Sequence, residues 1–189
     1  GNDVVIKHRL KKSYRNDKLD DKLRLERTKK EAKLLSDSRK LGVRTPYVYS
    51  IDLEDKSIVE EKINATKLHD IIVDTDDKND LVDLFASIGE NVSKLHEGEI
   101  IHGDVTTENI LVDQSGPIFI DFGLGRYSNL IEDKGTDLLV FKKSLTTKPP
   151  TITNATNPKY KFTLLYPFCL SVGLILYPMW PPSFFKFSF

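Results

Sequence analysis

The chain has 189 residues, of which 39% are hydrophobic and 30% are charged, and this composition indicates a folded protein with one or two small lobes. Its 28 basic and 28 acidic residues cancel, so the overall charge gives no support for nucleic-acid binding. The single cysteine, Cys169, excludes an internal disulfide framework and fits a reducing compartment.

The first predicted elements are a short strand over residues 4–10, which carries Lys7, and a helix over residues 19–41. The helix is predicted because the segment lacks Pro and Gly and its apolar residues recur at helical spacing. Strand lysines mostly lie in solvent at a sheet edge. Glu31, in the middle of the helix, either pairs with a neighbouring lysine in solvent or turns inward toward Lys7.

The middle of the chain predicts a hairpin and a second helix. Two apolar-rich runs, 47–53 and 57–63, flank a polar turn and predict the hairpin. One apolar stripe then continues for more than three helical turns and predicts a core helix just before residue 100. The residues of the stripe are Leu81, Leu84, Phe85, Ile88, Val92 and Leu95.

The stretch from residue 101 to residue 123 holds the strongest chemical signal. Two apolar runs, 110–112 and 118–120, flank a turn and predict a second hairpin. Polar side chains lie at its two outer ends, namely His102, Asp104, Asn109 and Asp121. Carboxylate and amide oxygens suit Mg²⁺, which usually shares its coordination sphere with phosphates. The three oxygen-bearing side chains therefore predict a magnesium and phosphate site at one edge of a small sheet.

The spacing of these residues resembles that of a protein kinase, with His-x-Asp-x-x-x-x-Asn followed by Asp-Phe-Gly at residue 121. A chance acidic hairpin in an unrelated domain is the alternative, and the number of coinciding positions disfavours it. In kinases the strand lysine binds the nucleotide phosphates and is held by a glutamate of the next helix. The resemblance therefore favours a Lys7–Glu31 pair, and it implies that His102 braces the loop instead of transferring protons.

The resemblance implies an α+β fold, a truncated two-lobed protein-kinase-like fold. Residues 1–63 would be a partial N-terminal lobe, and residues 64–148 a small C-terminal lobe with the catalytic hairpin. Backbone groups of Glu60 and Glu61, where the chain leaves the first lobe, would contact adenine. The alternative interpretation is that both are ordinary solvated residues. Only six residues precede Lys7, so the strands of the glycine-rich loop are lacking, and we expect weak ATP binding by this chain alone.

Three segments, residues 101–109, 119–125 and 132–137, resemble the small atypical serine/threonine kinases of the KEOPS/EKC complex. These kinases form the PRPK family, which is related to the RIO kinases. The resemblance extends over residues 3–147. Gly103, where most kinases have arginine, is typical of this family. The short stretch between Asp121 and Asp137 is also typical, and it leaves no room for a long activation loop that phosphorylation could order. Asp137 resembles the helix aspartate that braces the catalytic loop.

The resemblance also implies a role for each candidate site residue, with ATP and Mg²⁺ as cofactors. Asp104 would orient the attacking hydroxyl or water, while Asn109 and Asp121 would hold the metal on the phosphates. Lys7, held by Glu31, would steady the phosphate chain. Positioning and charge neutralisation of this kind are most of what phosphoryl transfer needs.

Membership of this family implies an ATP-dependent serine/threonine protein kinase or ATPase that supports threonylcarbamoyladenosine modification of tRNA. Its partners would be the other KEOPS/EKC subunits, including the threonylcarbamoyl transferase, with tRNA reached through the complex. The implied location is the cytoplasm and nucleus. One alternative is a catalytically silent kinase-like scaffold. The other is a small-molecule phosphotransferase of the aminoglycoside or choline kinase type, which shares His-Gly-Asp and the asparagine but not the segment 132–137.

Residues 149–189 read as a divergent apolar tail, since all 28 acidic residues of the chain lie before residue 151. Four prolines prevent the apolar stretch from being one long helix, namely Pro167, Pro178, Pro181 and Pro182. A membrane span needs about 20 apolar residues, and we do not expect membrane contact. The tail either packs on the lower lobe or on a partner, or it derives from a misread gene boundary. We favour the misread boundary and expect poor order there.

Overall fold

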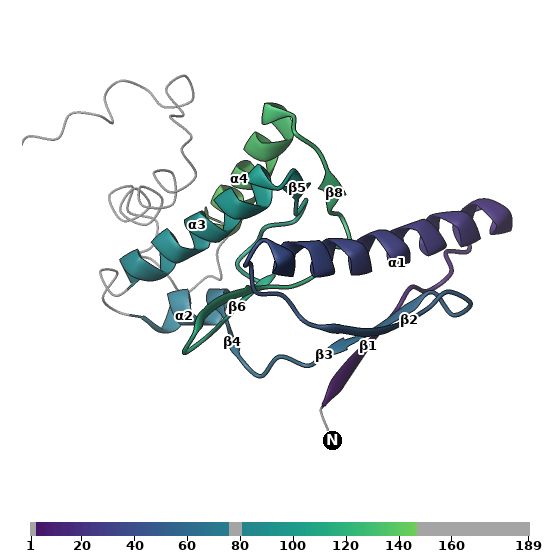
Figure 1. The fold of residues 1–189 in the computed structure, drawn as a ribbon, viewed down its shortest axis with the longest axis horizontal. Helices are drawn as coiled ribbons and strands as arrows, with labels where there is room; N and C mark the ends of the chain where they lie inside the picture. Colours follow the sequence, from purple (N-terminus) through teal and green to yellow (C-terminus); the bar gives the residue numbers. More distant parts are fainter. Residues whose placement is uncertain (1–2, 76–80, 147–189) are drawn as a thin grey trace, which may run out of the picture.

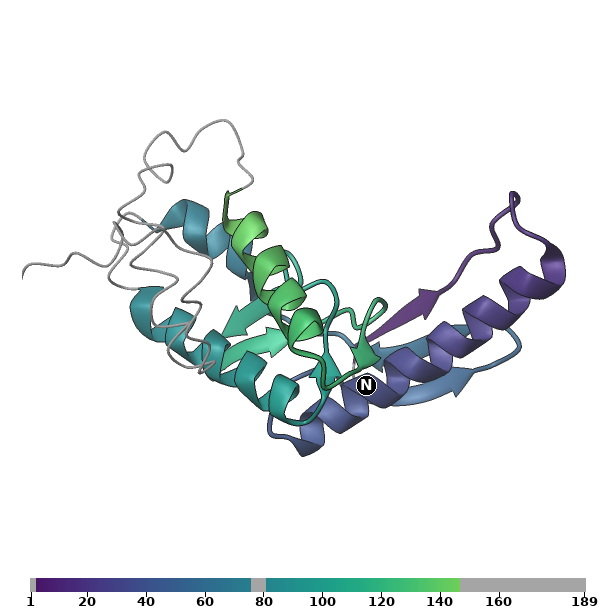
Figure 2. The same ribbon diagram turned by 90° about the horizontal axis from the view of Figure 1, so that it is seen from above.

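The computed structural model describes residues 3–75 and 81–146, which form two lobes with α1 lying along one of them (Figure 1, Figure 2). The N-terminal lobe, here called the upper lobe, is drawn at the lower right of Figure 1. Its elements are β1 (Val4–His8), α1 (Asp17–Lys40), β2 (Val48–Asp52) and β3 (Ser57–Glu61). The elements of the C-terminal lobe, here called the lower lobe, are β4 (Thr66–Lys67), α2 (Leu68–Asp74), α3 (Val82–Glu97), β5 (Ile100–Ile101), β6 (Ile110–Asp113), β7 (Gly116–Phe119), β8 (Arg126–Tyr127) and α4 (Ile131–Thr146).

Helix α1 has well-defined signals at both ends. Its N-terminus is capped by Asn16, whose side-chain oxygen accepts a hydrogen bond from the backbone N–H of Lys18 at 3.1 Å. Acidic residues in the first turn and basic residues in the last turn complement the helix dipole. Gly42, with a φ of 79°, follows the helix in the left-handed region that favours glycine. Buried Leu34 and Leu35 anchor the C-terminal half of the helix in the core.

The upper sheet is antiparallel, with β3 between β1 and β2, and it includes the hairpin predicted between residues 47 and 63. In its register Lys7 lies opposite Ile58, and Val5 lies opposite Glu60. Opposite residues point to the same face, as do alternate residues along a strand. Lys7 and Glu60 therefore share one face of the sheet, and Lys7 contacts Glu31 of α1 from it.

The lower lobe contains the second predicted hairpin, in which β6 and β7 pair along their whole length. Arg44 fastens this hairpin to the segment between α1 and β2. Its guanidinium donates two hydrogen bonds of 2.7 Å to Asp113, and its carbonyl accepts a bond of 2.9 Å from Phe119 N. These bonds fix the position of the hairpin relative to the upper lobe.

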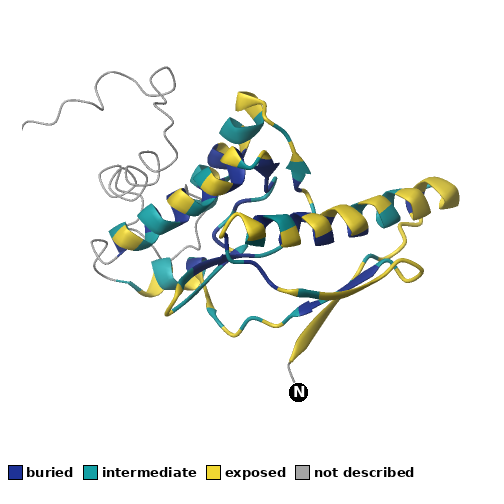
Figure 3. Cartoon of the chain, viewed as in Figure 1, coloured by how far each residue is buried: buried dark blue, intermediate teal, exposed yellow. Residues whose placement is uncertain are grey.

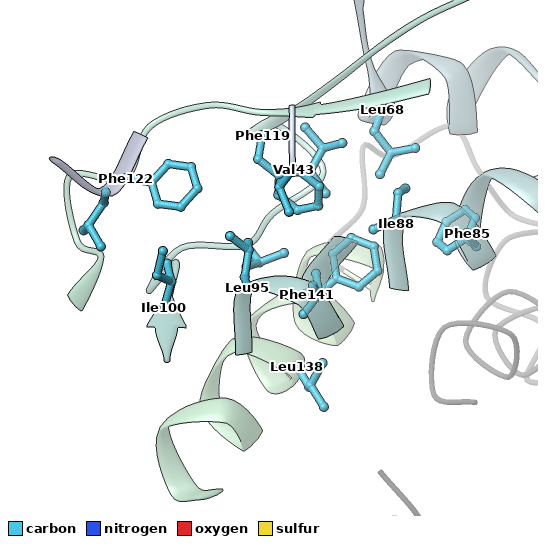
Figure 4. Close-up of a cluster of buried hydrophobic side chains, with 14 of the residues drawn as sticks. Val43, Leu68, Phe85, Ile88, Leu95, Ile100, Phe119, Phe122, Leu138 and Phe141 are labelled. Atoms are coloured by element: carbon cyan, nitrogen blue, oxygen red, sulfur yellow. The ribbon is translucent and has the colours of Figure 1, made fainter. Parts of the chain in front are cut away.

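The main core lies in the lower lobe and reaches up to the end of α1 (Figure 3, Figure 4). The predicted apolar stripe of α3 is confirmed, because five of its six residues are buried and Leu84 packs against the same cluster. Phe85 of α3 and Phe141 of α4 have ring centroids 6.0 Å apart. Phe119 and Phe122 extend the cluster to the segment that follows the hairpin. The core therefore supports both ends of the stretch from residue 101 to residue 123.

Four elements were not predicted: α2, β4, β5 and β8. The three strands have two residues each, too few to show a periodic pattern. The apolar tail and the misread-boundary hypothesis concern residues outside the described part of the chain. Within residues 3–75 and 81–146, no helix combines the length and the apolar character needed to cross a bilayer.

Candidate active site

We call residues 102–109 the catalytic loop, and the fully buried side chain of His102 braces it. Its Nε2 lies 3.1 Å from the carbonyl oxygen of Ile120, and its Nδ1 lies 3.3 Å from Asp104 N. A carbonyl accepts and a backbone N–H donates, so the imidazole carries its proton on Nε2 and is neutral. Burial lowers the pKa of His102, which favours the same state. With Phe122 at a ring-centroid distance of 4.3 Å, His102 has the bracing position predicted for it.

A buried carboxylate on α4 holds the same loop. Asp137 is 1% exposed, and its oxygens accept hydrogen bonds from His102 N at 2.9 Å and Gly103 N at 2.7 Å. His96, in the last turn of α3, lies 3.1 Å from Asp137 Oδ2. The predicted contact between Asp137 and the catalytic loop is therefore present, and His96 belongs to this support.

Gly103 is required by the backbone at its position. Its φ is 82°, and a Cβ there would lie 2.5 Å from the carbonyl oxygen of Leu124. Both the conformation and the close approach exclude a larger side chain. The loop can thus lie directly against the segment that follows Asp121.

Asp104 and Asn109 form one unit. The Asn109 amide nitrogen donates to the Asp104 carboxylate at 2.9 Å and to the Asp104 carbonyl at 3.0 Å. Ile120 N donates to the Asn109 carbonyl at 3.0 Å, which ties this loop to the strand end next to Asp121. The two ends of the hairpin are therefore adjacent, as the sequence predicted.

Asp121 has an unusual backbone conformation, with a φ of 62°. A left-handed non-glycine residue costs about 1 kcal/mol or more, and such residues concentrate at functional sites. Gly123 N donates to Asp121 Oδ1 at 3.1 Å, and a Cβ on Gly123 would lie 2.9 Å from the same oxygen. Glycine at this position therefore lets the turn close around the carboxylate.

Lys7 links the two lobes through two carboxylates. Its Nζ lies 2.5 Å from Glu31 Oε1 and 3.1 Å from Asp121 Oδ1. Burial acts to lower the pKa of Lys7, but the carboxylates of Glu31, Asp121 and Glu60 together outweigh it and the pKa is raised. Burial acts to raise the pKa of Asp121, but the attraction of Lys7 and the hydrogen bond from Gly123 N act against it, and the pKa is lowered. The predicted Lys7–Glu31 pair is thus present, and Lys7 also contacts Asp121.

Arg9 is a member of this cluster that the sequence reasoning missed. Its Nη2 contacts Glu31 Oε2, so Glu31 has a different cation on each oxygen. We call Lys7, Arg9, Glu31 and Asp121 the Lys7 cluster. The signal in the sequence was the spacing of Lys7 and Arg9, because residues two apart on a strand point to the same side.

Glu60 and Glu61 differ in their surroundings. Glu61 is half-buried, and its carboxylate accepts a hydrogen bond of 3.2 Å from Tyr47 N. Glu60 is 8% exposed and faces the Lys7 cluster, so its interpretation as an ordinary solvated residue is wrong. Strand register decides this, because it places Glu60 opposite Val5 and therefore on the face of Lys7. The backbone contact of these two residues with adenine stays a prediction.

The burial of Glu60 predicts a pH-dependent change in stability. Burial raises the pKa of Glu60, and Lys7 only partly opposes this effect. The folded-state pKa then lies above the unfolded value near 4.5, so ionisation costs stability as pH rises. Glu60→Gln should raise the free energy of unfolding at pH 7, because the neutral amide avoids the cost of keeping a charge buried. The gain should fade as pH is lowered to about 4.

Urea unfolding of the two proteins at a series of pH values measures this difference. Glu54→Gln, a change in the exposed β2–β3 turn, is the matched control and should be neutral throughout. A Glu60→Gln variant less stable than the unmodified protein at pH 7 would show that this carboxylate makes a favourable contact.

The residues present fit a magnesium ion shared with phosphates. Asn109 donates through its amide nitrogen, and Asp121 uses Oδ1 for Lys7 and Gly123. Neither the side-chain oxygen of Asn109 nor Oδ2 of Asp121 takes part in a hydrogen bond within the described part of the chain. Among the same residues, no three His, Cys, Asp or Glu side chains form a ligand set. Two protein oxygens suffice when phosphates and water supply the others.

Comparison with known proteins agrees with this geometry. Residues 1–160 match the family model described as "Protein kinase domain". The chain belongs to the protein kinase family. In fold it is similar to the Rio2 kinase of Chaetomium thermophilum, with a TM-score of 0.57, 19% identity, and coverage of 91% of this chain and 62% of that one. The predicted two-lobed, kinase-like α+β fold is thereby confirmed.

The names of two relatives of this chain agree with the predicted resemblance to the KEOPS kinases. A "Probable bifunctional tRNA threonylcarbamoyladenosine biosynthesis protein" of Methanosphaera stadtmanae is 69% identical over 148 residues, which cover 78% of this chain and 27% of that protein. "KEOPS complex subunit Bud32" of Pyrococcus abyssi is 37% identical over 142 residues, covering 75% of this chain and 64% of that protein. The resemblance to the KEOPS kinases is confirmed, and the chain spans about a quarter of its bifunctional relative.

Proposed function

We propose that the chain is the kinase part of an ATP- and Mg²⁺-dependent phosphotransferase, which transfers phosphate to serine or threonine hydroxyls or, with water as acceptor, hydrolyses ATP. The contact of Lys7 with both Glu31 and Asp121 carries the proposal, because it places a cation beside the oxygens that suit the metal. The structure of the similarly folded Rio2 kinase is described as a complex with ADP and Mg²⁺.

Each residue has a defined part in this reaction. Lys7 binds the phosphate chain while Glu31 limits where its ammonium can move. The Asp104 carboxylate, oriented by Asn109, accepts a hydrogen bond from the attacking hydroxyl or water and aligns it with the phosphorus. Mg²⁺, held by Asn109 and Asp121, would neutralise charge on the phosphate oxygens. The raised pKa of Lys7 and the lowered pKa of Asp121 keep both groups charged at neutral pH.

Transfer of labelled γ-phosphate from ATP by the full natural protein tests the proposal. Label should appear on serine and threonine, or as inorganic phosphate, and it should disappear when Mg²⁺ is removed. Lys7→Arg should lower the rate by about 10²-fold, because the guanidinium cannot occupy the position of the compact ammonium and small misplacements are costly. Lys11→Arg, a change at an exposed position nearby, is the control. Equal rates for both variants would remove Lys7 from the mechanism.

We further propose that this activity supports threonylcarbamoyladenosine modification of tRNA in a KEOPS-type assembly that includes the threonylcarbamoyl transferase. The names of the two relatives support this proposal. Reconstitution of the modification with and without the protein tests it, and unchanged modification in its absence would contradict it. The location in the cytoplasm and nucleus stays a prediction.

A further inference from the structure

The unusual feature of the Lys7 cluster is the double pairing of one buried carboxylate. The Glu31 side chain is 1% exposed, with the Lys7 ammonium on Oε1 and the Arg9 guanidinium on Oε2. A buried charge is stable only when it is paired and hydrogen-bonded. If Lys7 moves to pair with another anion, Glu31 still has an ion-pair partner in Arg9.

Arg9 is held in place by its own backbone. Its N–H donates to the Lys56 carbonyl at 3.2 Å, and its carbonyl accepts a hydrogen bond of 3.2 Å from Arg24 Nη1. Its guanidinium also reaches the turn over residues 121–123, because a Cβ on Gly123 would lie 3.4 Å from Arg9 Nη2. Arg9 therefore lies between α1 and the turn that carries Asp121, with its side chain 22% exposed.

The charge of the cluster depends on Arg9. With it, the two cations Lys7 and Arg9 balance the two carboxylates Glu31 and Asp121. Without it, the cluster has one excess negative charge and Glu60 adds another from the same face. A nucleotide phosphate chain carries several negative charges, and charges in a partly buried site are weakly screened by salt. The loss of Arg9 would therefore repel phosphate more strongly with each additional phosphate group.

We propose that Arg9 is a positioning residue for the phosphate chain of the nucleotide. It holds one oxygen of Glu31, which leaves Lys7 able to share its ammonium between Glu31 and a phosphate oxygen. It also offsets negative charge that would oppose phosphate binding. Arg9 acts through Glu31 and the local field and needs no contact with the nucleotide. The inference rests on the proposed function, in which the phosphates lie beside Lys7.

The affinities of adenosine, AMP, ADP and ATP, each measured by calorimetry with Mg²⁺ on the full natural protein, test this role. Arg9→Gln should leave adenosine affinity nearly unchanged and should weaken ATP by about tenfold or more, with AMP and ADP between them. Arg9→Lys, which keeps the charge, should restore most of the ATP affinity. Lys11→Gln removes the same charge from an exposed site nearby and should change none of the four affinities substantially.

The outcomes separate a charge effect on the phosphates from a general loss of binding. An equal loss for all four ligands in Arg9→Gln, or no loss for any of them, would overturn the inference. If that variant does not fold, Arg9→Lys decides, since an equal loss of adenosine and ATP affinity there would also overturn it. Failure of the unmodified protein to bind any phosphate-bearing nucleotide would overturn the proposed function and, with it, this inference.

Discussion

Replacement of Asp104 by alanine should lower ATP turnover by about 10²- to 10⁴-fold, the usual contribution of a positioned acid–base group. MgATP binding should change by less than about threefold, because the variant keeps every member of the Lys7 cluster. Asn109 should stay oriented, since its amide nitrogen also donates to the Asp104 carbonyl at 3.0 Å. Steady-state turnover and calorimetric binding, measured on the same preparation, separate the two effects.

The matched control for this variant is Glu108→Ala, which removes an exposed carboxylate from the same loop. Glu108 pairs with Lys67 at 2.8 Å, and both side chains are about half exposed, so the pair contributes little. Turnover should therefore be close to that of the unmodified protein. Equal turnover in Asp104→Ala and the unmodified protein would favour a kinase-like scaffold over an enzyme.

Asp137→Ala should destabilise the fold by about 3 kcal/mol or more. The change leaves two backbone N–H groups of the catalytic loop without their acceptor, that of buried His102 and that of half-buried Gly103. Each unsatisfied buried donor costs about 1–3 kcal/mol. Urea unfolding monitored by circular dichroism measures the loss, and activity should fall with it because the loop that carries Asp104 loses its support.

Two further substitutions on α4 serve as comparisons for Asp137→Ala. Asp137→Asn keeps one acceptor oxygen but turns an NH₂ group toward a backbone N–H, so its loss of stability should be intermediate. Glu132→Ala removes an exposed carboxylate from the first turn of the same helix and should cost about 0.5 kcal/mol or less. A loss for Asp137→Ala as small as that of Glu132→Ala would contradict the bracing role.

The sequence predicted the parts of the site that short spacings define. Asp104, Asn109 and Asp121 flank one hairpin, so strand pairing alone brings them to the same edge. Prediction of the Lys7–Glu31 pair also needed the kinase resemblance. Periodicity places Glu31 in a helix but does not show which face of that helix packs against the sheet.

The remaining features depend on tertiary contacts. The burial of Glu60 follows from strand register and from the position of α1 over that face, neither of which has a local signal. The role of Arg9 depends on the side chain of a helix 22 residues away. Gly103 is explained by the close approach of the Leu124 backbone, which only the folded chain reveals.

The most direct test of the account is a crystal structure of the full natural protein with ADP and Mn²⁺, in which anomalous scattering locates the metal. The account predicts one Mn²⁺ coordinated by Asn109 and Asp121 and by phosphate oxygens of ADP, with the Lys7 ammonium on the same phosphate chain. A metal bound away from Asp121, or phosphates beyond the reach of Lys7, would contradict it.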